Sequence, residues 1–516
     1  MPLAKAGESI PNNYDELVEL YMSFREFHLP EVENGVPDYS PSAMGNKFEG
    51  LLEYQQRLNR IDTTGWDVSK QVDFRTVKAE MKGMEFEHRV TRPWEKDPAF
   101  YAVIRFQFGP KMHPSMPIPS LPIADNRIEQ VKIQLEAIPV ILDQAISNLT
   151  DPVADLAYIA IYTTGRQIDL LDGFIGGLEE HHPELLTAAA AARESVSDFR
   201  EWLTEKRPEM RNGAGVGVDN YNWYLENVAL MPYTWEELLL LSEREYERAV
   251  ATMKLKEHRN RHSPVLKPVD NADDYMERYN NAMDHMYRFL HSSELFTVPE
   301  YLDPPGHARG FRRGETRDYF AHVLDRYPLP LSLHGYAGHT HDELRTARDE
   351  RPIRGMSRLY FVDAVRAEAL ATGLERMLYH TGITEGVPRA DEINYHLKAF
   401  RASRSITDLK MHSNEMTFEE AFQFNISHTP YGWVPEDSPT LWHDLELYLR
   451  SPLYGTSYMV GPLQLDKLLT EEFIQKRDDF DIRKFMDNFL EAGMIPLKLI
   501  SLEMHGKPGA FKHSGN

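Results

Sequence analysis

Three histidines and two acidic residues lie within the stretch L-S-L-H-G-Y-A-G-H-T-H-D-E, residues 331–343. Imidazole and carboxylate groups bind divalent metals, and imidazole also transfers protons near neutral pH. The stretch is similar to the H-E-x-x-H motif of zinc hydrolases, in which the glutamate after the first histidine is the general base. Here the residue after His334 is Gly335, so that base is missing. The stretch therefore predicts a metal site or a proton-transfer site that lacks the glutamate base.

The spacing of the histidines leaves two interpretations open. His334 and His339 are five positions apart, which is about 140° around a regular α-helix. They can bind one ion only if the segment from Gly335 to Gly338 distorts the helix. His339 and Glu343 are four apart and would share a helix face. The alternative is a set of polar residues at the end of a loop, with some of the histidines merely hydrogen-bonded.

A second group of chemically capable residues lies in F-R-A-S-R-S-I-T-D-L-K-M-H, residues 400–412. The pattern is helical, and it places Arg401, Arg404, Asp408 and His412 close to one line along the helix. A histidine oriented by a carboxylate, with guanidinium groups beside it, suits a site that binds an anion and moves a proton. The alternative is a solvated face held by salt bridges.

The elements that must position these residues are predicted to be helices. Apolar residues recur at helical spacing, and strict alternation is rare. The segments with this pattern are 127–147, 152–179, 185–205, 234–256 and 269–290. Near the C-terminus an apolar stripe precedes a capping glycine and a proline stop: Ile482, Phe485, Met486, Phe489, Leu490, Gly493 and Pro496. We therefore predict a mainly α protein.

Composition excludes several classes of function. The formal charge of −23 over 516 residues argues against nucleic acid and against anionic membranes as partners. The chain has no cysteine, which excludes disulfides and thiolate metal ligands, so any metal must be held by histidines and carboxylates. No stretch reaches the roughly 18 apolar residues of a membrane span. We expect a soluble cytoplasmic protein.

Four ordered blocks of the chain resemble a known family. They are E-A-L-A-T-G-L-E-R at 368–376, R-A-S-R-S-I-T-D-L-K-M-H at 401–412, S-Y-M-V-G at 457–461, and F-D-I-R-K-F-M-D-N-F-L-E-A-G-M-I-P-L at 480–497. The metallopeptidase-like proteins grouped as domain of unknown function 885 carry E-G-W-A-x-Y-A-E-R, R-A-x-R-x-x-x-D-x-x-x-H, S-Y-x-x-G and F-D-x-R-x-F-x-x-x-L-x-x-G-x-x-P-L in the same order. The resemblance also extends upstream, through V-D-N-Y-N-W-Y-L at 218–225.

The resemblance implies a fold and a set of residues. It implies a large helical, zincin-like catalytic domain with a deep central cleft, formed by 1–516 as one unit or by an N-terminal half, 1–230, and a site-bearing half, 231–516. By the same resemblance Glu368 matches the third metal ligand and His339 the second histidine of the family's first block. Polar residues expected around the cleft match Arg404, Asp408, His412 and Tyr458.

The chain departs from the family where the chemistry is expected. The family's first block, H-E-x-x-P-G-H-H, becomes H-G-Y-A-G-H-T-H, one residue shorter before the Gly-His pair. With a gap inside the turn, His334 matches the first ligand and Gly335 replaces the base. Without a gap, Leu333 replaces the ligand and His334 the base. Both alignments remove the glutamate, and the second also removes a ligand.

Three functions follow. The first is an enzyme of the lyase, isomerase or hydrolase type that performs acid–base chemistry on a small anionic substrate, with no favoured cofactor. Its catalytic residues are His334, His339, Asp408, His412 and Tyr458, and its substrate-binding residues are Arg401, Arg404, Tyr336 and Arg313. The second is a metal-dependent hydrolase of small peptides or amides, in which His334, His339 and Glu368 bind zinc or another divalent ion and Glu343 or a histidine is the base. The third is a non-catalytic binding protein. A homodimer is possible in each case.

Overall fold

The computed structural model describes residues 13–105, 115–302, 311 and 317–506. Helices dominate this part of the chain, which confirms the predicted mainly α class. The strands within it are two short ones, β1 (Val32–Glu33) and β2 (Val36–Pro37), which pair antiparallel. None of the helices described is both long and apolar enough to cross a lipid bilayer.

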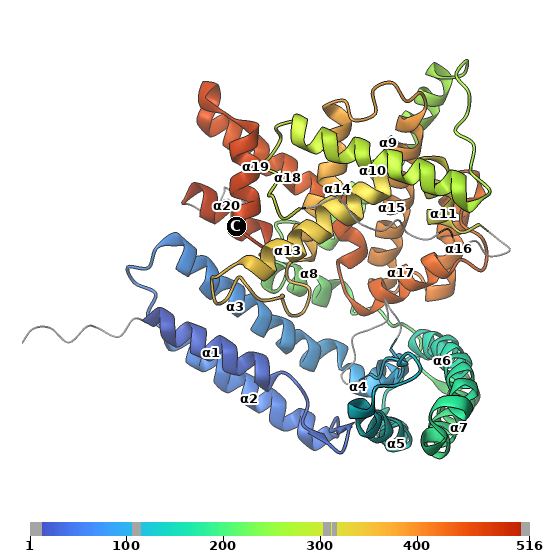
Figure 1. Ribbon diagram of the computed structural model, residues 1–516. Helices are drawn as coiled ribbons and strands as arrows, with labels where there is room; N and C mark the ends of the chain where they lie inside the picture. The colour runs from blue at the N-terminus through green and yellow to red at the C-terminus, as the bar shows by residue number, and fades with distance from the viewer. Residues whose placement is uncertain (1–12, 106–114, 303–310, 312–316, 507–516) are drawn as a thin grey trace, which may run out of the picture.

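The N-terminal helices form the lower part of the molecule in Figure 1. In chain order they are α1 (Asn13–Phe27), α2 (Pro41–Arg60), α3 (Val68–Phe86), the π-helix η1 (Glu87–Thr91), α4 (Pro93–Lys96), η2 (Pro98–Tyr101), α5 (Asp125–Asn148), α6 (Ala154–His181), η3 (Pro183–Leu185), α7 (Leu186–Lys206) and η4 (Arg207–Glu209). The long helices α5, α6 and α7 coincide with three of the segments predicted from apolar spacing. Both α5 and α6 pack against α7.

The remaining helices form the upper part and carry the candidate site. They are α8 (Val218–Asn227), α9 (Trp235–Arg259), α10 (Ala272–Ser292), α11 (Tyr319–Arg326), α12 (Leu329–Leu333), the π-helix η5 (His334–Thr340), α13 (His341–Arg348), α14 (Ala364–His380), α15 (Ala390–His412), α16 (Phe418–His428), η6 (Pro430–Gly432), α17 (Pro439–Arg450), α18 (Tyr454–Lys476), η7 (Arg477–Asp479), α19 (Ile482–Glu491) and α20 (Leu497–His505).

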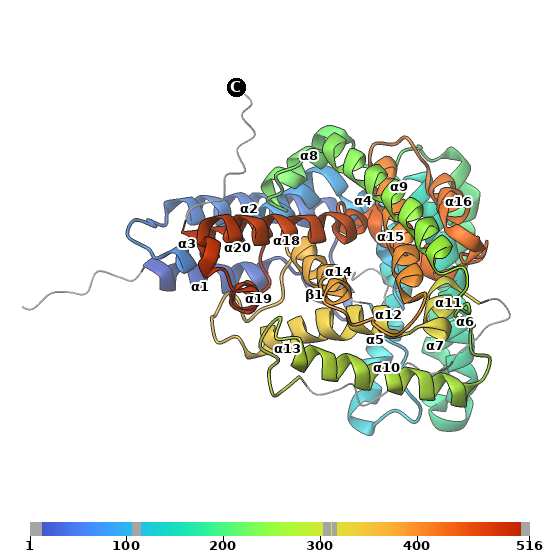
Figure 2. The same ribbon diagram turned by 90° about the horizontal axis from the view of Figure 1, so that it is seen from above.

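Four of these elements surround the site. The helix α14 packs against α18 and against η5, and α15 packs against α9 and α18. Figure 2 shows α14, α15 and α18 grouped near the middle of the molecule, with α12 and α13 alongside. Residues far apart in the sequence are thereby brought to one place.

Local signals in the sequence fix where several helices begin and end. The hydroxyl of Thr234 accepts a hydrogen bond from the backbone of Glu237, whose side chain bonds back, and this capping box starts α9. At the other end of the chain, the predicted apolar stripe is buried in α19. Gly493 follows it with φ of 84°, a left-handed conformation that glycine adopts without steric cost.

The core consists of two clusters of buried apolar side chains. The larger one runs from Tyr39 to Leu502 and includes residues on both sides of position 230. The smaller one lies among α1, α2 and α3 and includes Ile353 from the distant connection between α13 and α14. The division into one unit or two halves stays a prediction, but no break in packing coincides with residue 230 in the described part of the larger cluster.

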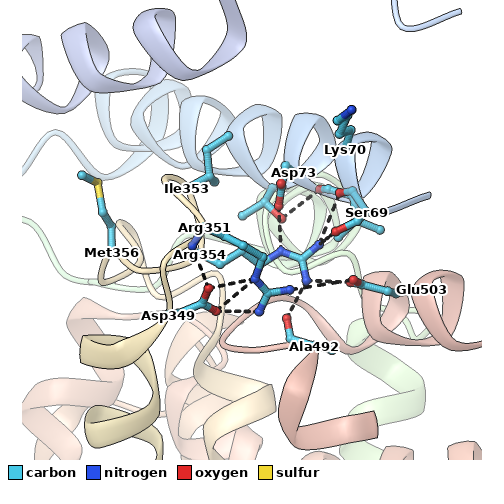
Figure 3. Close-up of polar contacts among 12 residues, drawn as sticks. Ser69, Lys70, Asp73, Asp349, Arg351, Ile353, Arg354, Met356, Ala492 and Glu503 are labelled. Atoms are coloured by element: carbon cyan, nitrogen blue, oxygen red, sulfur yellow. Dashed lines mark hydrogen bonds and ion pairs between the residues drawn. The ribbon is translucent and has the colours of Figure 1, made fainter. Parts of the chain in front are cut away.

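The connection between α13 and α14, residues 349–363, is tied to helices on both sides; we call it the strap. Arg354, 1% exposed, donates from Nε to Asp73 Oδ1 of α3 at 2.7 Å. Its Nη1 donates to Glu503 Oε2 of α20 at 2.6 Å and to the carbonyl oxygen of Ala492 at 2.7 Å. Figure 3 shows this guanidinium held between the two helices. The strap therefore enters α14 from a fixed position.

We expect Arg354→Met to lower the free energy of unfolding by about 3–5 kcal/mol, because it leaves the carboxylate of Asp73 buried without its partner. Chemical denaturation measures this change. The double variant Arg354→Met with Asp73→Leu removes both charges and should be clearly more stable than the single variant. Equal stability of the single and double variants would show that an Asp73 carboxylate without Arg354 costs no stability.

Candidate metal centre

A π-helical turn places His334 and His339 on the same side of one helical rod. The rod runs through α12, η5 and α13. His334 is the first residue of the π-helix η5, and His339 is its last but one. A π-helix bonds each residue to the fifth one along and has a wider turn than an α-helix, so residues five apart lie closer together around its axis. The two imidazole rings are 5.1 Å apart between centroids and 75° apart in plane. The distortion that the spacing requires is present.

The close approach of this turn to α14 depends on Gly338. A Cβ atom added there would lie 2.6 Å from both Cα and Cβ of Ala371 on α14. The backbone of η5 therefore packs directly against α14, where the acidic residues of the site are located. Any side chain at this position must push the two helices apart.

We expect Gly338→Ala to destabilise the fold by about 1–3 kcal/mol through overpacking and to weaken metal binding at the site. Thermal unfolding and titration with a divalent metal measure the two effects. Gly176→Ala is the control, because a Cβ at that position in α6 has no neighbour within 4 Å. This control should be stabilised by about 1 kcal/mol through higher helix propensity. Unchanged metal affinity in Gly338→Ala would contradict the proposed role of the close packing.

Glu368 of α14 faces both histidines. Its Oε2 lies 3.6 Å from Nε2 of His334, and its Oε1 lies 3.5 Å from Nε2 of His339. The three ligand atoms of this cluster lie within 4.8 Å of one another. Two imidazole nitrogens and one carboxylate oxygen are the protein ligands of many catalytic zinc sites, which keep a fourth position open. We call His334, His339 and Glu368 the donor cluster.

The electrostatics of the donor cluster fit a cation. Glu368 is 1% exposed, and its Oε1 has no hydrogen-bond partner among the described residues. Burial raises the pKa of Glu368, but the adjacent His334 and His339 outweigh burial and hold the pKa below its ordinary value. Burial lowers the pKa of His339, but Glu368 outweighs burial and raises it. A divalent cation would satisfy the carboxylate and use the lone pairs of both imidazoles.

A second layer of residues orients His334. Its Nδ1 lies 2.9 Å from Oε1 of Glu375, two helical turns after Glu368 on the same face of α14. Arg401 of α15 donates to both oxygens of Glu375, at 2.9 and 2.8 Å. Burial raises the pKa of Glu375, but Arg401 and the bond from His334 outweigh burial and bring the pKa to about 2. The ionised carboxylate therefore accepts the Nδ1 proton, which leaves the lone pair of Nε2 directed at the donor cluster.

We expect Glu375→Gln to weaken metal affinity about 10–100-fold, because an outer carboxylate orients the ring and increases the basicity of the ligand nitrogen. Metal titration against a competing chelator measures the change. Glu446→Gln is the matched control, since Glu446 is also a buried partner of an arginine, Arg450, at 3.3 Å. It should lower stability without changing metal affinity. Equal affinity in Glu375→Gln and wild type would exclude an orienting role.

Tyr458 of α18 borders the donor cluster. Its ring centroid lies 6.2 Å from that of His334. Burial raises the pKa of its hydroxyl well above the ordinary value, so the phenol is protonated at neutral pH. The guanidinium of Arg404 also lies over this ring, 5.2 Å from its centroid, and is itself paired with Asp444. Tyr336 lies within η5 itself and is half-buried.

Asp408 and His412 lie apart from the donor cluster. His412 is eleven positions after Arg401 on α15, or about 16 Å along the helix axis. It is fully buried, its Nε2 lies 3.0 Å from the carbonyl oxygen of Tyr448, and burial lowers its pKa to about 4. Asp408 accepts hydrogen bonds from the backbone and hydroxyl of Thr456, both at 2.8 Å, and so caps the start of α18. Asp408 thus supports α18, the helix that carries Tyr458, while His412 contacts the preceding helix α17.

The structure brings together only part of the predicted site. The residues around one point are His334, His339, Glu368, Arg401 and Tyr458, and Arg404 lies behind Tyr458. The third histidine of the motif, His341, is fully buried against Phe296, and burial lowers its pKa to about 3. Arg313 lies outside the described residues. Glu375 is a site residue that is not among those predicted from the sequence. Its spacing of seven positions from Glu368 places both residues on one face of α14.

A comparison with known families supports the family resemblance over the C-terminal part of the chain, after the two histidines of the donor cluster. Residues 364–504 match a family model described as "Bacterial protein of unknown function (DUF885)". This range includes Glu368, Glu375, Arg401 and Tyr458. No curated protein sequence matches the chain.

Two solved structures share the fold. One is described as "a putative lipoprotein of unknown function" from Shewanella oneidensis, with a TM-score of 0.70 and 15% identity over 96% of this chain and 100% of that one. The other is described as "the putative lipoprotein" from Colwellia psychrerythraea, with a TM-score of 0.70 and 15% identity over 96% of this chain and 99% of that one. At this identity the likeness concerns the fold alone.

Proposed function

We propose that this protein is a metal-dependent hydrolase of small peptide or amide substrates, with His334, His339 and Glu368 as the metal ligands. The observation that carries the proposal is the convergence of their three donor atoms within 4.8 Å. From the sequence alone, an acid–base enzyme with no favoured cofactor is the first expectation. The π-helical turn favours the metal-dependent alternative, because it reduces the angular separation of the two histidines. The family model matches residues 364–504, which include Glu368 but neither histidine, and the family is described as of unknown function. The zincin-like relation is therefore itself part of this proposal.

A divalent ion at the donor cluster would act as a Lewis acid that polarises a substrate carbonyl group. The chain's own residues would do the rest. Glu375 and Arg401 would keep the ring of His334 in place. The protonated hydroxyl of Tyr458 would donate a hydrogen bond to the oxyanion that develops on the carbonyl oxygen.

The general base differs from that of H-E-x-x-H hydrolases. Gly335 occupies the position of their glutamate and offers no side chain. Glu343, one turn after His339, is exposed and provides a carboxylate that could accept a proton. Substrates with good leaving groups depend least on a strong base, so we propose activated amides and short peptides rather than folded proteins.

The first test is metal content and metal-dependent cleavage. Protein purified without chelator should contain about one divalent ion per chain by elemental analysis. A panel of short peptides and activated amides should be cleaved, dialysis against chelator should stop cleavage, and zinc, manganese or cobalt should restore it. Failure to bind any divalent ion would overturn the proposal.

The acid–base alternative has its own supporting observation, which is the hydrogen-bonded pair of His334 and Glu375 beside the protonated Tyr458. These groups could transfer protons without a metal. Turnover that chelator does not change would favour this alternative over the hydrolase. The cytoplasmic location expected from the sequence stays a prediction. Both solved structures are described as lipoproteins, but at 15% identity that description cannot be transferred to this chain.

A further inference from the structure

A continuous row of aromatic side chains leads from the surface of the protein to the donor cluster. Phe361, at the end of the strap, has its ring 5.3 Å from that of Tyr454. Tyr454 lies 6.1 Å from Tyr458, and Tyr458 lies 6.2 Å from His334. Phe361 is 41% exposed, while Tyr454 and Tyr458 are partly exposed. The distances are those of interacting rings in edge-to-face and offset arrangements.

Phe361 is held outward by an unusual backbone. Tyr360 and Phe361 have φ of 56° and 55°, two successive residues other than glycine in the left-handed region. Such conformations are costly, persist only where surrounding contacts determine them, and cluster at functional sites. The strained backbone at Tyr360 and Phe361 therefore sets the position of the exposed Phe361 ring.

Buried contacts keep the strap in this conformation. The side chain of Tyr360 packs closely against Gly83 of α3. A Cβ atom added at Gly83 would lie 2.4 Å from Cβ of Tyr360. Its carbonyl oxygen accepts a hydrogen bond from the hydroxyl of Tyr224 at 3.1 Å. Arg358 of the strap pairs with Glu80 at 3.2 Å, with both side chains buried. Together with Arg354 (Figure 3), these contacts fix the position from which Phe361 projects.

The charges around the row favour an uncharged ligand. Arg401 is paired with Glu375, and Arg404 is paired with Asp444 and donates to the hydroxyl of Tyr448 at 2.9 Å. Both guanidinium groups are almost fully buried, at 3% and 2% exposure. Neither is available to a substrate carboxylate without breaking a buried ion pair, which is costly. The aromatic rings therefore provide the recognition that the arginines do not.

We infer that Phe361, Tyr454 and Tyr458 form a binding subsite for an aromatic or large apolar side group of the substrate. The reacting bond would lie at the donor cluster, so this part of the inference rests on the proposed function. The side group would stack on the row of rings, with Phe361 as the outer contact. The substrate class is thus an uncharged peptide or amide with a phenyl-like group next to the cleaved bond, rather than a small anion.

The test uses two pairs of probes on the full chain, measured by isothermal titration calorimetry. Acetohydroxamate and benzohydroxamate, which differ in their methyl and phenyl groups, are titrated into zinc-loaded protein. N-acetyl-alanine amide and N-acetyl-phenylalanine amide are titrated into chelator-treated protein. In both pairs the phenyl probe should bind about tenfold more tightly, as expected from burial of an aromatic ring.

The variant Phe361→Ala should lower the affinity for both phenyl probes about tenfold and leave acetohydroxamate unchanged. Phe473→Ala is the matched control, since Phe473 is 47% exposed on α18, fifteen positions after Tyr458. It should bind all probes as wild type does. Equal affinity within each pair, absence of binding by the phenyl probes, or an unchanged preference in Phe361→Ala would each overturn the subsite.

The two proposals fail in different ways. If zinc does not bind, the hydroxamates will show no zinc-dependent binding and the proposed function is wrong. The amide pair will still report whether the aromatic row selects a phenyl group. If zinc binds and both hydroxamates bind equally, the metal centre stands and the subsite is wrong.

Discussion

The variants His339→Ala and Glu368→Gln are expected to lose the divalent metal and all metal-dependent turnover. Each removes one of three donor groups that lie within 4.8 Å of one another. Loss of an outer residue that only orients a ligand costs about 10–100-fold in metal affinity, so loss of a direct ligand should cost more than about 100-fold. Titration of chelator-treated protein with zinc, in competition with a chromophoric chelator, measures this change.

Glu368→Gln is the more informative of the two variants. The amide has nearly the same size as the carboxylate and can still accept the hydrogen bond that the hydroxyl of Thr372 donates to Oε2 at 3.2 Å. Glu343→Gln removes the same charge from an exposed position on α13, one turn after His339, and should bind zinc as wild type does. Wild-type zinc affinity in Glu368→Gln would show that the donor cluster is not the metal site.

Whether the two histidines converge could not be decided from their spacing. The sequence states a condition, namely that His334 and His339 meet only if the helix between them is distorted. The π-helical turn fulfils this condition, and the close packing of Gly338 on α14 accompanies it. That packing is a tertiary contact between residues more than thirty positions apart. Local periodicity contains no information about it, so the sequence could not choose between a metal site and a loop.

The second predicted group shows the opposite difficulty. Helical periodicity correctly places Arg401, Arg404, Asp408 and His412 on one helix, but it gives their angle around the axis and not their contacts. The axial rise separates His412 from Arg401 by about 16 Å, so only one end of the face reaches the donor cluster. The other end holds α18 through Asp408. The predicted proton transfer by His412 stays untested, and its burial with a pKa of about 4 favours a structural role.

The helical elements themselves were predictable because their signals are local. Apolar spacing, capping residues and the glycine after α19 depend on neighbours within a few positions. Glu375 was within reach of the same reasoning, since it lies two turns after Glu368 on α14 and therefore on the same face. Its role as the partner of both His334 and Arg401 was not predictable, because it requires three helices to meet.

Tyr458→Phe is expected to lower kcat on the order of 10²–10³-fold without changing metal affinity. The hydroxyl is protonated at neutral pH because burial raises its pKa well above the ordinary value, and it lies beside His334. A donor placed where negative charge develops stabilises the transition state more than the bound substrate, so its removal affects kcat rather than KM. Phenylalanine keeps the ring, so the contacts with His334 and Arg404 are retained. Steady-state kinetics on the best substrate of the amide panel separate the two constants.

Tyr431→Phe is the control, because it also removes a tyrosine hydroxyl. Tyr431 is 56% exposed, and its hydroxyl bonds to Glu257 of α9, remote from the donor cluster. This variant should show wild-type kcat and KM. If Tyr458→Phe also retains its kcat, the hydroxyl does not contact the developing charge. If it instead raises KM alone, the hydroxyl contributes to substrate binding and not to stabilisation of the transition state. The ring, which phenylalanine retains, would then still belong to the row with Phe361 and Tyr454.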